Sequence, residues 1–260
     1  MRLYGPQTGR TFTIDGCEFK RNILDCGTTA IVFTGQDTRG GNYLIANNLF
    51  KQRTTGISDS ITTATLGTTM IENNIFDRNG TGIYRRLATP ATLMTVNHNT
   101  FYQCYTTDVY ISGAIDCRDE TGGDFGPTVT NNLIVGANNA YKDALMSSTT
   151  AVTTINADNN GFYNVHGGGD VGYLGSAYRN LAYLNGLTDA SGNILGNADP
   201  FVDAANNDFH LKAGSWALYG RDGYIGALKP AAEVPEPATL LLMGTGALGV
   251  IGYVRRRQLR

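Results

Sequence analysis

The sequence predicts an all-β fold, a parallel β-helix whose successive coils stack into a solenoid, followed by a single C-terminal transmembrane helix. Three observations predict it. An asparagine between apolar residues recurs at intervals that match the chain length of one coil. Glycine is abundant (33 residues) and charged residues make up only 16% of the 260, which suits many short strands joined by tight turns. A long uncharged segment near the C-terminus precedes a run of arginines.

Composition narrows the class of protein before any motif is considered. Apolar residues make up 42% of the chain, which is too many for a disordered protein. The many glycines and asparagines disfavour a helical bundle. The formal net charge is -2, and the body is more acidic than this value because the tail carries a cluster of arginines. Nucleic-acid binding needs a concentrated basic face, so it is not expected.

Within residues 10–165, five segments share an asparagine at a common phase with apolar residues. The aligned residues follow one another at steps of 26, 25, 33 and 28 positions: Asn48, Asn74, Asn99, Asn132 and Asn160. Cys17 holds the same place 31 positions before the first of them. About 25 residues at ~3.3 Å per residue suffice for one coil of three strands. Because stacked coils place equivalent residues above one another, we expect these asparagines to form a hydrogen-bonded ladder.

A second short strand follows each asparagine motif, and one residue of it is expected to face outward. Alternation along the strand turns outward the residue after Ile57, Ile83, Val109 or Tyr141. The predicted outward column is Ser58, Tyr84, Tyr110 and Lys142. Two tyrosines ~5 Å apart could stack on sugar rings, with Arg85 and Arg86 beside them for acidic groups. Alternatively, the tyrosines pack under a surface loop.

Residues 166–230 change in character, and we interpret them as the terminal coils and cap of the solenoid. Three consecutive glycines at 167–169 interrupt the repeat. Apolar motifs then recur without the asparagine spacing, around Phe201, Phe209 and Trp216. A cap hides the last open strand edge. The chain therefore divides into coils over 1–165, a cap over 166–230 and a tail over 231–260.

The repeat over residues 10–165 resembles the pectate-lyase-like superfamily, and the motifs after residue 197 resemble the terminal coil of choice-of-anchor surface proteins. The resemblance implies a right-handed parallel β-helix. It also implies that an enzyme of this kind would act on polysaccharide in a groove along one sheet. Lyases of the superfamily hold Ca²⁺ with carboxylates and use an arginine or lysine as the base. The fold alone implies no activity.

The fourth coil is the longest, and its extra residues are expected between Ile115 and Asp124. Long loops on a rigid solenoid are common places for function. Under the lyase resemblance, four carboxylates would supply hard oxygen ligands for Ca²⁺: Asp116, Asp119, Glu120 and Asp124. Arg118 or Lys142 would be the base, since a nearby cation lowers the pKa of a basic group. The alternative is a solvated charged loop without a metal.

The four cysteines, Cys17, Cys26, Cys104 and Cys117, contain no CxxC pair, so a zinc site is not expected. Two interpretations stay open. The thiols are free and buried, as cysteines often are, or two of them form a disulfide such as Cys104–Cys117 in an oxidising compartment.

The tail contains Val234, Pro235, Glu236 and Pro237, an uncharged segment over 238–254, and then Arg255, Arg256 and Arg257. At 1.5 Å per residue the segment is ~25 Å long, enough to span a bilayer core, and the arginines mark its cytoplasmic end. The arrangement resembles the PEP-CTERM sorting signal. That resemblance implies transient insertion into the inner membrane, cleavage by exosortase, and delivery to the cell surface or extracellular matrix. The alternative is a plain C-terminal membrane anchor.

At the other end of the sequence, residues 1–6 show no apolar segment of a signal peptide. We therefore expect a truncated chain that lacks upstream coils. Three functions stay open: a noncatalytic surface or matrix protein that binds extracellular polysaccharide, a Ca²⁺-dependent polysaccharide lyase, and a purely structural or adhesive solenoid. The low density of ionisable residues on the repeats favours the first.

Overall fold

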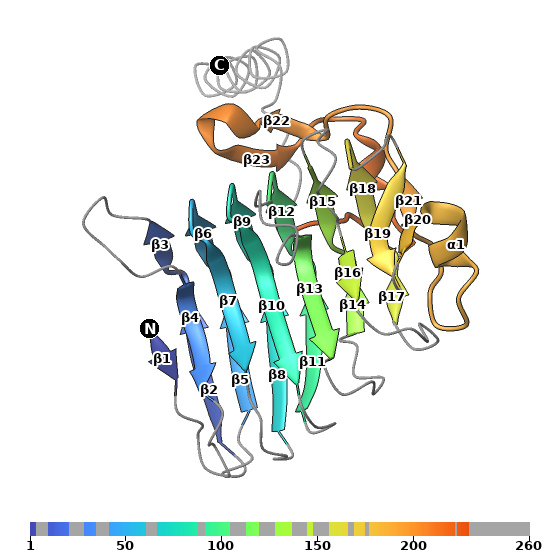
Figure 1. Cartoon of the computed structure of the whole chain (residues 1–260). Coiled ribbons are helices and arrows are strands. Elements are labelled where there is room, and N and C mark those ends of the chain that lie inside the picture. Colours follow the sequence, from blue (N-terminus) through green and yellow to red (C-terminus); the bar gives the residue numbers. More distant parts are fainter. Residues whose placement is uncertain are drawn as a thin grey trace, which may run out of the picture.

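The protein is described from a computed structural model, which defines residues 1–3, 10–20, 29–34, 42–60, 67–87, 92–104, 113–119, 128–136, 145–147, 156–165, 169–174, 177–221 and 223–228. Most of the regular structure in these residues is strand, arranged in three long sheets that successive coils build side by side (Figure 1). The prediction of a solenoid-like, all-β arrangement of parallel strands is confirmed. The hand of the winding and the transmembrane helix stay predictions.

Each coil contributes strands to three sheets, called sheets I, II and III here. Sheet I has the order β1 (Arg2–Leu3), β4 (Thr29–Thr34), β7 (Thr55–Ser60), β10 (Thr81–Leu87), β13 (Gly113–Asp119), β16 (Leu145–Ser147), β19 (Asp170–Leu174) and β20 (Ala177–Asn180). Sheet II contains β2 (Thr11–Asp15), β5 (Asn42–Ala46), β8 (Gly67–Glu72), β11 (Thr92–Asn97), β14 (Thr128–Thr130) and β17 (Ala157–Asp158). Sheet III contains β3 (Glu18–Lys20), β6 (Leu49–Lys51), β9 (Ile75–Asp77), β12 (Thr100–Tyr102), β15 (Leu133–Val135), β18 (Gly161–Tyr163) and β21 (Ile194–Leu195). Within these three sheets the described strands pair in parallel, except that β20 closes sheet I in the antiparallel direction.

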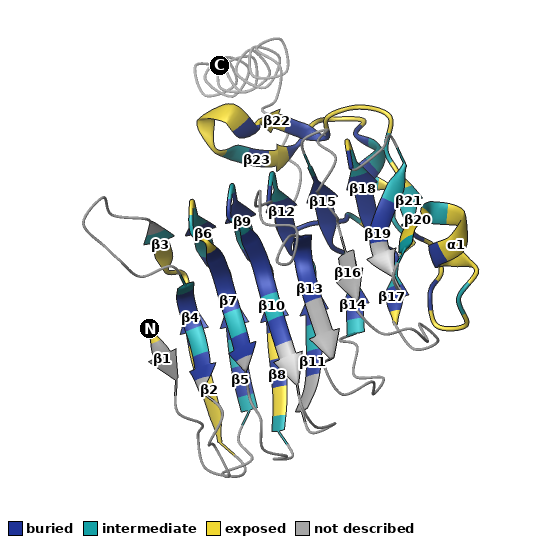
Figure 2. Cartoon of the chain, viewed as in Figure 1, coloured by how far each residue is buried: buried dark blue, intermediate teal, exposed yellow. Residues whose placement is uncertain are grey.

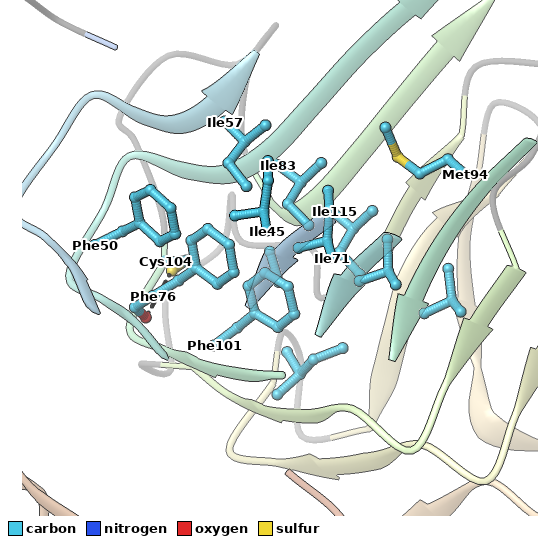
Figure 3. Close-up of a cluster of buried hydrophobic side chains, with 14 of the residues drawn as sticks. Ile45, Phe50, Ile57, Ile71, Phe76, Ile83, Met94, Phe101, Cys104 and Ile115 are labelled. Atoms are coloured by element: carbon cyan, nitrogen blue, oxygen red, sulfur yellow. Dashed lines mark hydrogen bonds between the residues drawn. The ribbon is translucent and has the colours of Figure 1, made fainter. Parts of the chain in front are cut away.

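Apolar side chains fill the inside of the coils in columns. Sheet I contributes a fully buried column of Ile31, Ile57, Ile83 and Ile115. Sheet III contributes stacked rings of Phe19, Phe50, Phe76 and Phe101, with centroids 4.7 to 5.0 Å apart. Figure 3 shows the last three of these rings beside the isoleucines. Parallel strands lie ~4.8 Å apart, so a ring repeated in every coil recurs at a distance at which aromatic rings pack well.

The corner between sheets II and III explains why asparagines occur in pairs. Its first residue has a left-handed backbone, with φ between 51° and 57°, at Asn47, Asn73, His98, Asn131 and Asn159. Asparagine tolerates this conformation better than most residues with a side chain. The second residue of the corner is buried in each coil. The first residue of each pair therefore provides the left-handed backbone of the corner, and the second places its side chain in the interior.

The second residues of these corners form a hydrogen-bonded ladder: Asn48, Asn74, Asn99, Asn132 and Asn160. At each step, one side-chain oxygen accepts two bonds from the preceding asparagine. Asn99 Oδ1 accepts from the backbone N–H of Asn74 at 2.9 Å and from its Nδ2 at 3.0 Å. Asn99 Nδ2 also donates to the carbonyl of Ile71 at 2.8 Å. The ladder thus satisfies polar groups that would cost about 1–3 kcal/mol each if they were buried without partners.

The ladder continues one step further and then ends at a helix. Asn160 donates to Asn193 Oδ1 from its backbone N–H and from Nδ2, at 2.9 and 3.0 Å. Asn193 in turn donates to Asn185 Oδ1 at 2.8 Å from Nδ2. Asn185 is the last residue of α1 (Leu181–Asn185), so a helical residue takes the place of a further coil. At the opposite end, Cys17 occupies the ladder position and donates its backbone N–H to Asn48 Oδ1 at 2.8 Å.

After β21 the chain turns back along the outside of sheet III. We call residues 197–228 the strap; it contains β22 (Phe201–Asp203), the 3-10 helix η2 (Ala204–Asn206), β23 (Asp208–Leu211) and the 3-10 helix η3 (Trp216–Leu218). β22 and β23 pair with each other in the antiparallel direction. Apolar residues of the strap and of sheet III form a second buried cluster that includes Leu133, Val135, Phe201, Phe209, Leu211, Ala217 and Ile225. Buried and exposed residues accordingly occur side by side along the strap, whose ribbon carries both dark blue and yellow segments in Figure 2.

The strap ends at the corner between sheets II and III. The Gly226 N–H donates to the carbonyl of Asn131 at 2.8 Å, and the Ala227 N–H donates to Thr100 Oγ1 at 3.0 Å. Gly226 has a φ of 103°, and a Cβ there would lie 3.0 Å from both Leu133 and Thr100. Glycine is therefore required at this point for the chain to lie against the corner.

Candidate functional site

The outer face of sheet I carries a column of positions on successive strands. The register aligns Val32, Ser58, Tyr84, Asp116 and Met146. The adjacent column of buried isoleucines faces inward, so alternation turns this column outward. Tyr84 is partly exposed and lies between Ser58 and Asp116. An aromatic ring can pack on the apolar face of a sugar, and a hydroxyl group such as that of Ser58 can bond to sugar hydroxyls.

Beyond Tyr84 the column differs from the predicted one, which continued with Tyr110 and Lys142. Cys104 corresponds to Asn79 in the turn after sheet III, because the preceding strands β12 and β9 pair in register. Thr81 follows Asn79 by two positions, whereas its partner Gly113 follows Cys104 by nine. Seven of the eight residues that the fourth coil has beyond the 25-residue coil before it therefore precede β13, and one follows it. Tyr110 and Lys142 lie outside the described residues.

Arg85 faces the interior of the solenoid. It lies two positions after the inward Ile83, is only 3% exposed, and has its Nε 3.9 Å from Oδ2 of the fully buried Asp59. Removing one partner of such a pair leaves a buried charge uncompensated. Arg85 thus belongs to the core and not to the outward column. Arg86 is in register with Arg118, and the side chains of both lie outside the described part of the structure.

Of the four predicted Ca²⁺ ligands, Asp116 is the one whose side chain belongs to the described part of the structure. Asp116 is fully buried in the outward column of β13. Asp119 stands three positions further along the same strand, in register with Leu87, and its side chain lies outside the described part of the structure. Glu120 and Asp124 lie outside the described residues. The described part of the chain contains no cluster of three or more potential metal-binding side chains.

Cys104 is a free, buried thiol, so the proposed Cys104–Cys117 disulfide is not present. Its Sγ donates to the carbonyl of Phe76 at 3.2 Å, a contact drawn in Figure 3. Burial is the largest cause that raises the pKa of the Cys104 thiol to about 12. Cys17 is free and exposed at the open end of the ladder.

The predicted sorting residues lie outside the described part of the structure. They are Val234, Pro235, Glu236, Pro237, Arg255, Arg256 and Arg257, together with the apolar segment over 238–254. Among the helices that the structure does describe, none has the length and apolar character needed to cross a membrane.

Comparisons with known proteins inform on the tail. No curated protein and no solved structure matches the chain. Residues 233–258 match the family model of the PEP-CTERM protein-sorting motif. The matched stretch includes the Pro-Glu-Pro element, the apolar segment and the arginine run. The chain therefore carries a PEP-CTERM sorting signal at its C-terminus, which marks it for export, a transient membrane-anchored state and processing by exosortase.

Proposed function

We propose that the solenoid of this exported protein binds extracellular polysaccharide at the cell surface or in the matrix, through the outer face of sheet I. The observation that carries the proposal is the position of Tyr84, partly exposed in the middle of that face between Ser58 and Asp116. The sorting signal supports it, because it delivers the protein to the compartment where such polymers occur.

The physical argument rests on rigidity and repetition. Fully buried isoleucines lie directly behind the outward column, so the backbone that carries Tyr84 is held rigidly in position. Successive strands repeat the outward position every ~4.8 Å, which gives a linear polymer a row of contacts along the solenoid. Asp116 is fully buried, so it lies beneath the surface and Tyr84 supplies the contact with the sugar.

The test is the substitution Tyr84→Ala, assayed by affinity electrophoresis of the full chain against a panel of acidic and neutral polysaccharides. Loss of one stacking contact should weaken binding about tenfold, equivalent to ~1.4 kcal/mol. Tyr178→Ala is the matched control, because Tyr178 is an exposed tyrosine of sheet I on the antiparallel end strand. Equal retention of the Tyr84→Ala variant and the unaltered protein would remove this face from consideration.

The two other functions predict different results with the same polymers. A Ca²⁺-dependent lyase would release unsaturated products that disappear on addition of EDTA, and Arg118 and Lys142 remain the predicted bases. A structural or adhesive solenoid would neither bind nor cleave any member of the panel while keeping its fold.

A further inference from the structure

A lysine, an asparagine and a buried aspartate meet where the strap crosses the solenoid. Lys51 Nζ, on β6, donates to Oδ1 of Asn207, in the turn between β22 and β23. The same nitrogen lies 3.3 Å from Oδ2 of Asp77 on the neighbouring strand β9. The amine of Lys51 is thus held between a carboxamide and a carboxylate.

Asp77 is well placed to accept a proton from that amine. Its side chain is fully buried, and its Oδ1 accepts a bond from Arg78 Nε at 2.7 Å. Its Oδ2 is also buried and has no hydrogen-bond partner among the described residues. One carboxylate oxygen is therefore occupied by Arg78, while the other is directed toward Lys51.

Asn207 is fixed by its backbone. It has a left-handed conformation, with φ 69° and ψ 20°, and its N–H donates to the carbonyl of Ala204. The adjoining Phe201 and Phe209 are buried against Tyr102 with ring centroids 5.9 and 5.5 Å away. The carboxamide is consequently presented to Lys51 by a turn that the strap itself anchors.

From this geometry we propose that Lys51 and Asn207 form an intramolecular isopeptide bond, with Asp77 as the proton carrier. Asp77 takes a proton from the lysine ammonium, and the neutral Nζ attacks Cγ of Asn207. Asp77 then returns the proton to the carboxamide nitrogen and the Cγ–N bond breaks. The ammonia that leaves takes up the second proton, which the attacking nitrogen releases once it is bonded to Cγ. The ammonium and the carboxamide are converted into one secondary amide and one ammonium ion, so no oxidant or other reactant is needed.

The carboxamide of Asn207 is a poor acyl donor, and its proximity to the amine of Lys51 compensates for this. A carboxamide reacts with a free amine very slowly in solution, but groups held in contact can gain an effective concentration of roughly 10⁵–10⁸ M. The reaction needs to occur only once per molecule, and the departure of ammonia makes it irreversible. Lys212 offers a contrast within the strap, because its Nζ contacts the backbone carbonyl of Asp199 at 3.1 Å and not a side-chain carboxamide.

The test is the mass of the purified, folded full chain. The expected mass is lower than that of the sequence by one ammonia, and trypsin should no longer cleave after Lys51. The digest should contain one branched peptide that joins Lys51 to Asn207. An unmodified mass after prolonged incubation of the folded protein, with normal cleavage after Lys51, would overturn the proposal.

Three variants separate this bond from other losses of ammonia. Lys51→Arg keeps a cation beside Asp77 but lacks the attacking amine, and Asn207→Gly keeps the left-handed turn but lacks the carboxamide. Both should show the full sequence mass, and Asp77→Asn should accumulate the bond much more slowly. If Lys51→Arg still loses ammonia, the loss arises elsewhere, for example by ring closure at Asn79-Gly80, and the assignment fails. Circular dichroism establishes that each variant is folded, and the peptide map of the unaltered chain decides the question even where a variant is not.

Discussion

At the residue scale, the two asparagines of one corner differ in what their replacement should cost. The first adopts a left-handed backbone, which glycine also adopts readily, and at Asn47 its side chain makes an exposed hydrogen bond to Asp15 Oδ1. The second makes buried hydrogen bonds on both sides, to the preceding and the following coil. In the corner of Asn47 and Asn48, the two adjacent residues are therefore expected to differ in tolerance, because the bonds of Asn48 are buried and the side-chain bond of Asn47 is exposed.

The ladder residue Asn99 provides the test of this difference. We expect Asn99→Ala to lower the free energy of unfolding by about 3 kcal/mol or more, because several buried groups of Asn74, Ile71 and Asn132 lose a partner at about 1–3 kcal/mol each. Denaturant titration measures the change. The exposed, left-handed Asn47 is the control, and Asn47→Gly should stay within about 0.5 kcal/mol of the unaltered protein. Equal losses for the two variants would contradict the division of tasks.

The two free cysteines should differ sharply in reactivity. The thiolate is the reactive form, and the pKa of the Cys104 thiol is raised to about 12 by burial. We expect Cys104 to resist alkylation at a pH of about 8 in the folded protein, while the exposed Cys17 reacts. An unfolded thiol ionises near pH ~8.5, so the stability that this group contributes is complete below that pH and declines as the pH rises toward the folded value. Mass spectrometry of alkylated peptides measures both sites, and rapid labelling of folded Cys104 would be the contrary result.

Membership of a residue in the repeat could be predicted from the sequence better than the residues that it contacts. The five asparagines share one phase, and Asn193 follows Asn160 by 33 positions in a similar context, so the same pattern could have found it. Alternation from Ile83 could also have placed Arg85 inside. Its partner Asp59 belongs to the coil before, and Asn185 completes the ladder from a helix. Such contacts depend on register and on chain reversal, which local sequence does not encode.

At the element scale, the stacked phenylalanines of sheet III form the most regular part of the core. Phe76 is fully buried between Phe50 and Phe101, with centroid distances of 4.8 and 4.7 Å. We expect Phe76→Ala to cost about 3–5 kcal/mol of stability, because it opens a cavity in the middle of the column. Thermal and denaturant unfolding measure this loss. Phe12→Ala is the control, since Phe12 is 38% exposed on the edge strand β2, and a similar loss there would show that the column is not the stabilising element.

Strand positions in the fourth coil could not be predicted by counting from a motif. Counting is reliable only while coil lengths are constant, as from β6 to β9, whose residues Phe50 and Phe76 pair in register. In the fourth coil most of the added residues come before β13, which moves Asp116 into the place expected for Tyr110. A solenoid accepts extra residues at any of its turns, so the length of a coil does not reveal which turn holds them.

At the scale of the whole molecule, the strap is a separate layer on sheet III. We expect Phe201→Ala to loosen this layer without melting the solenoid, because Phe201 packs on Tyr102 and Phe209 in the second apolar cluster. Amides of the strap should exchange with solvent much faster, while those of sheet II keep their protection. Val202→Ala is the control from the same strand, since Val202 is exposed. Loss of protection throughout the chain would indicate that strap and solenoid unfold as one unit.

The path of the strap was the least predictable feature of the fold. Its motifs indicated an end cap, yet within the described residues its strands pair with each other and not with the last coil. One signal was present in β15, where Leu133, Ile134 and Val135 are all buried. A strand that is apolar on both faces needs cover on both, but the sequence does not indicate which distant segment supplies it.

The final contacts of the strap fix the point on the solenoid from which the chain continues toward the sorting signal. Gly226 and Ala227 are bound at the junction of sheets II and III, the one junction of the three that sheet I does not share. The residues that lead to the sorting signal therefore leave the solenoid at this junction. The outer face of sheet I, which we propose binds polysaccharide through Tyr84, lies on a different sheet from this attachment point.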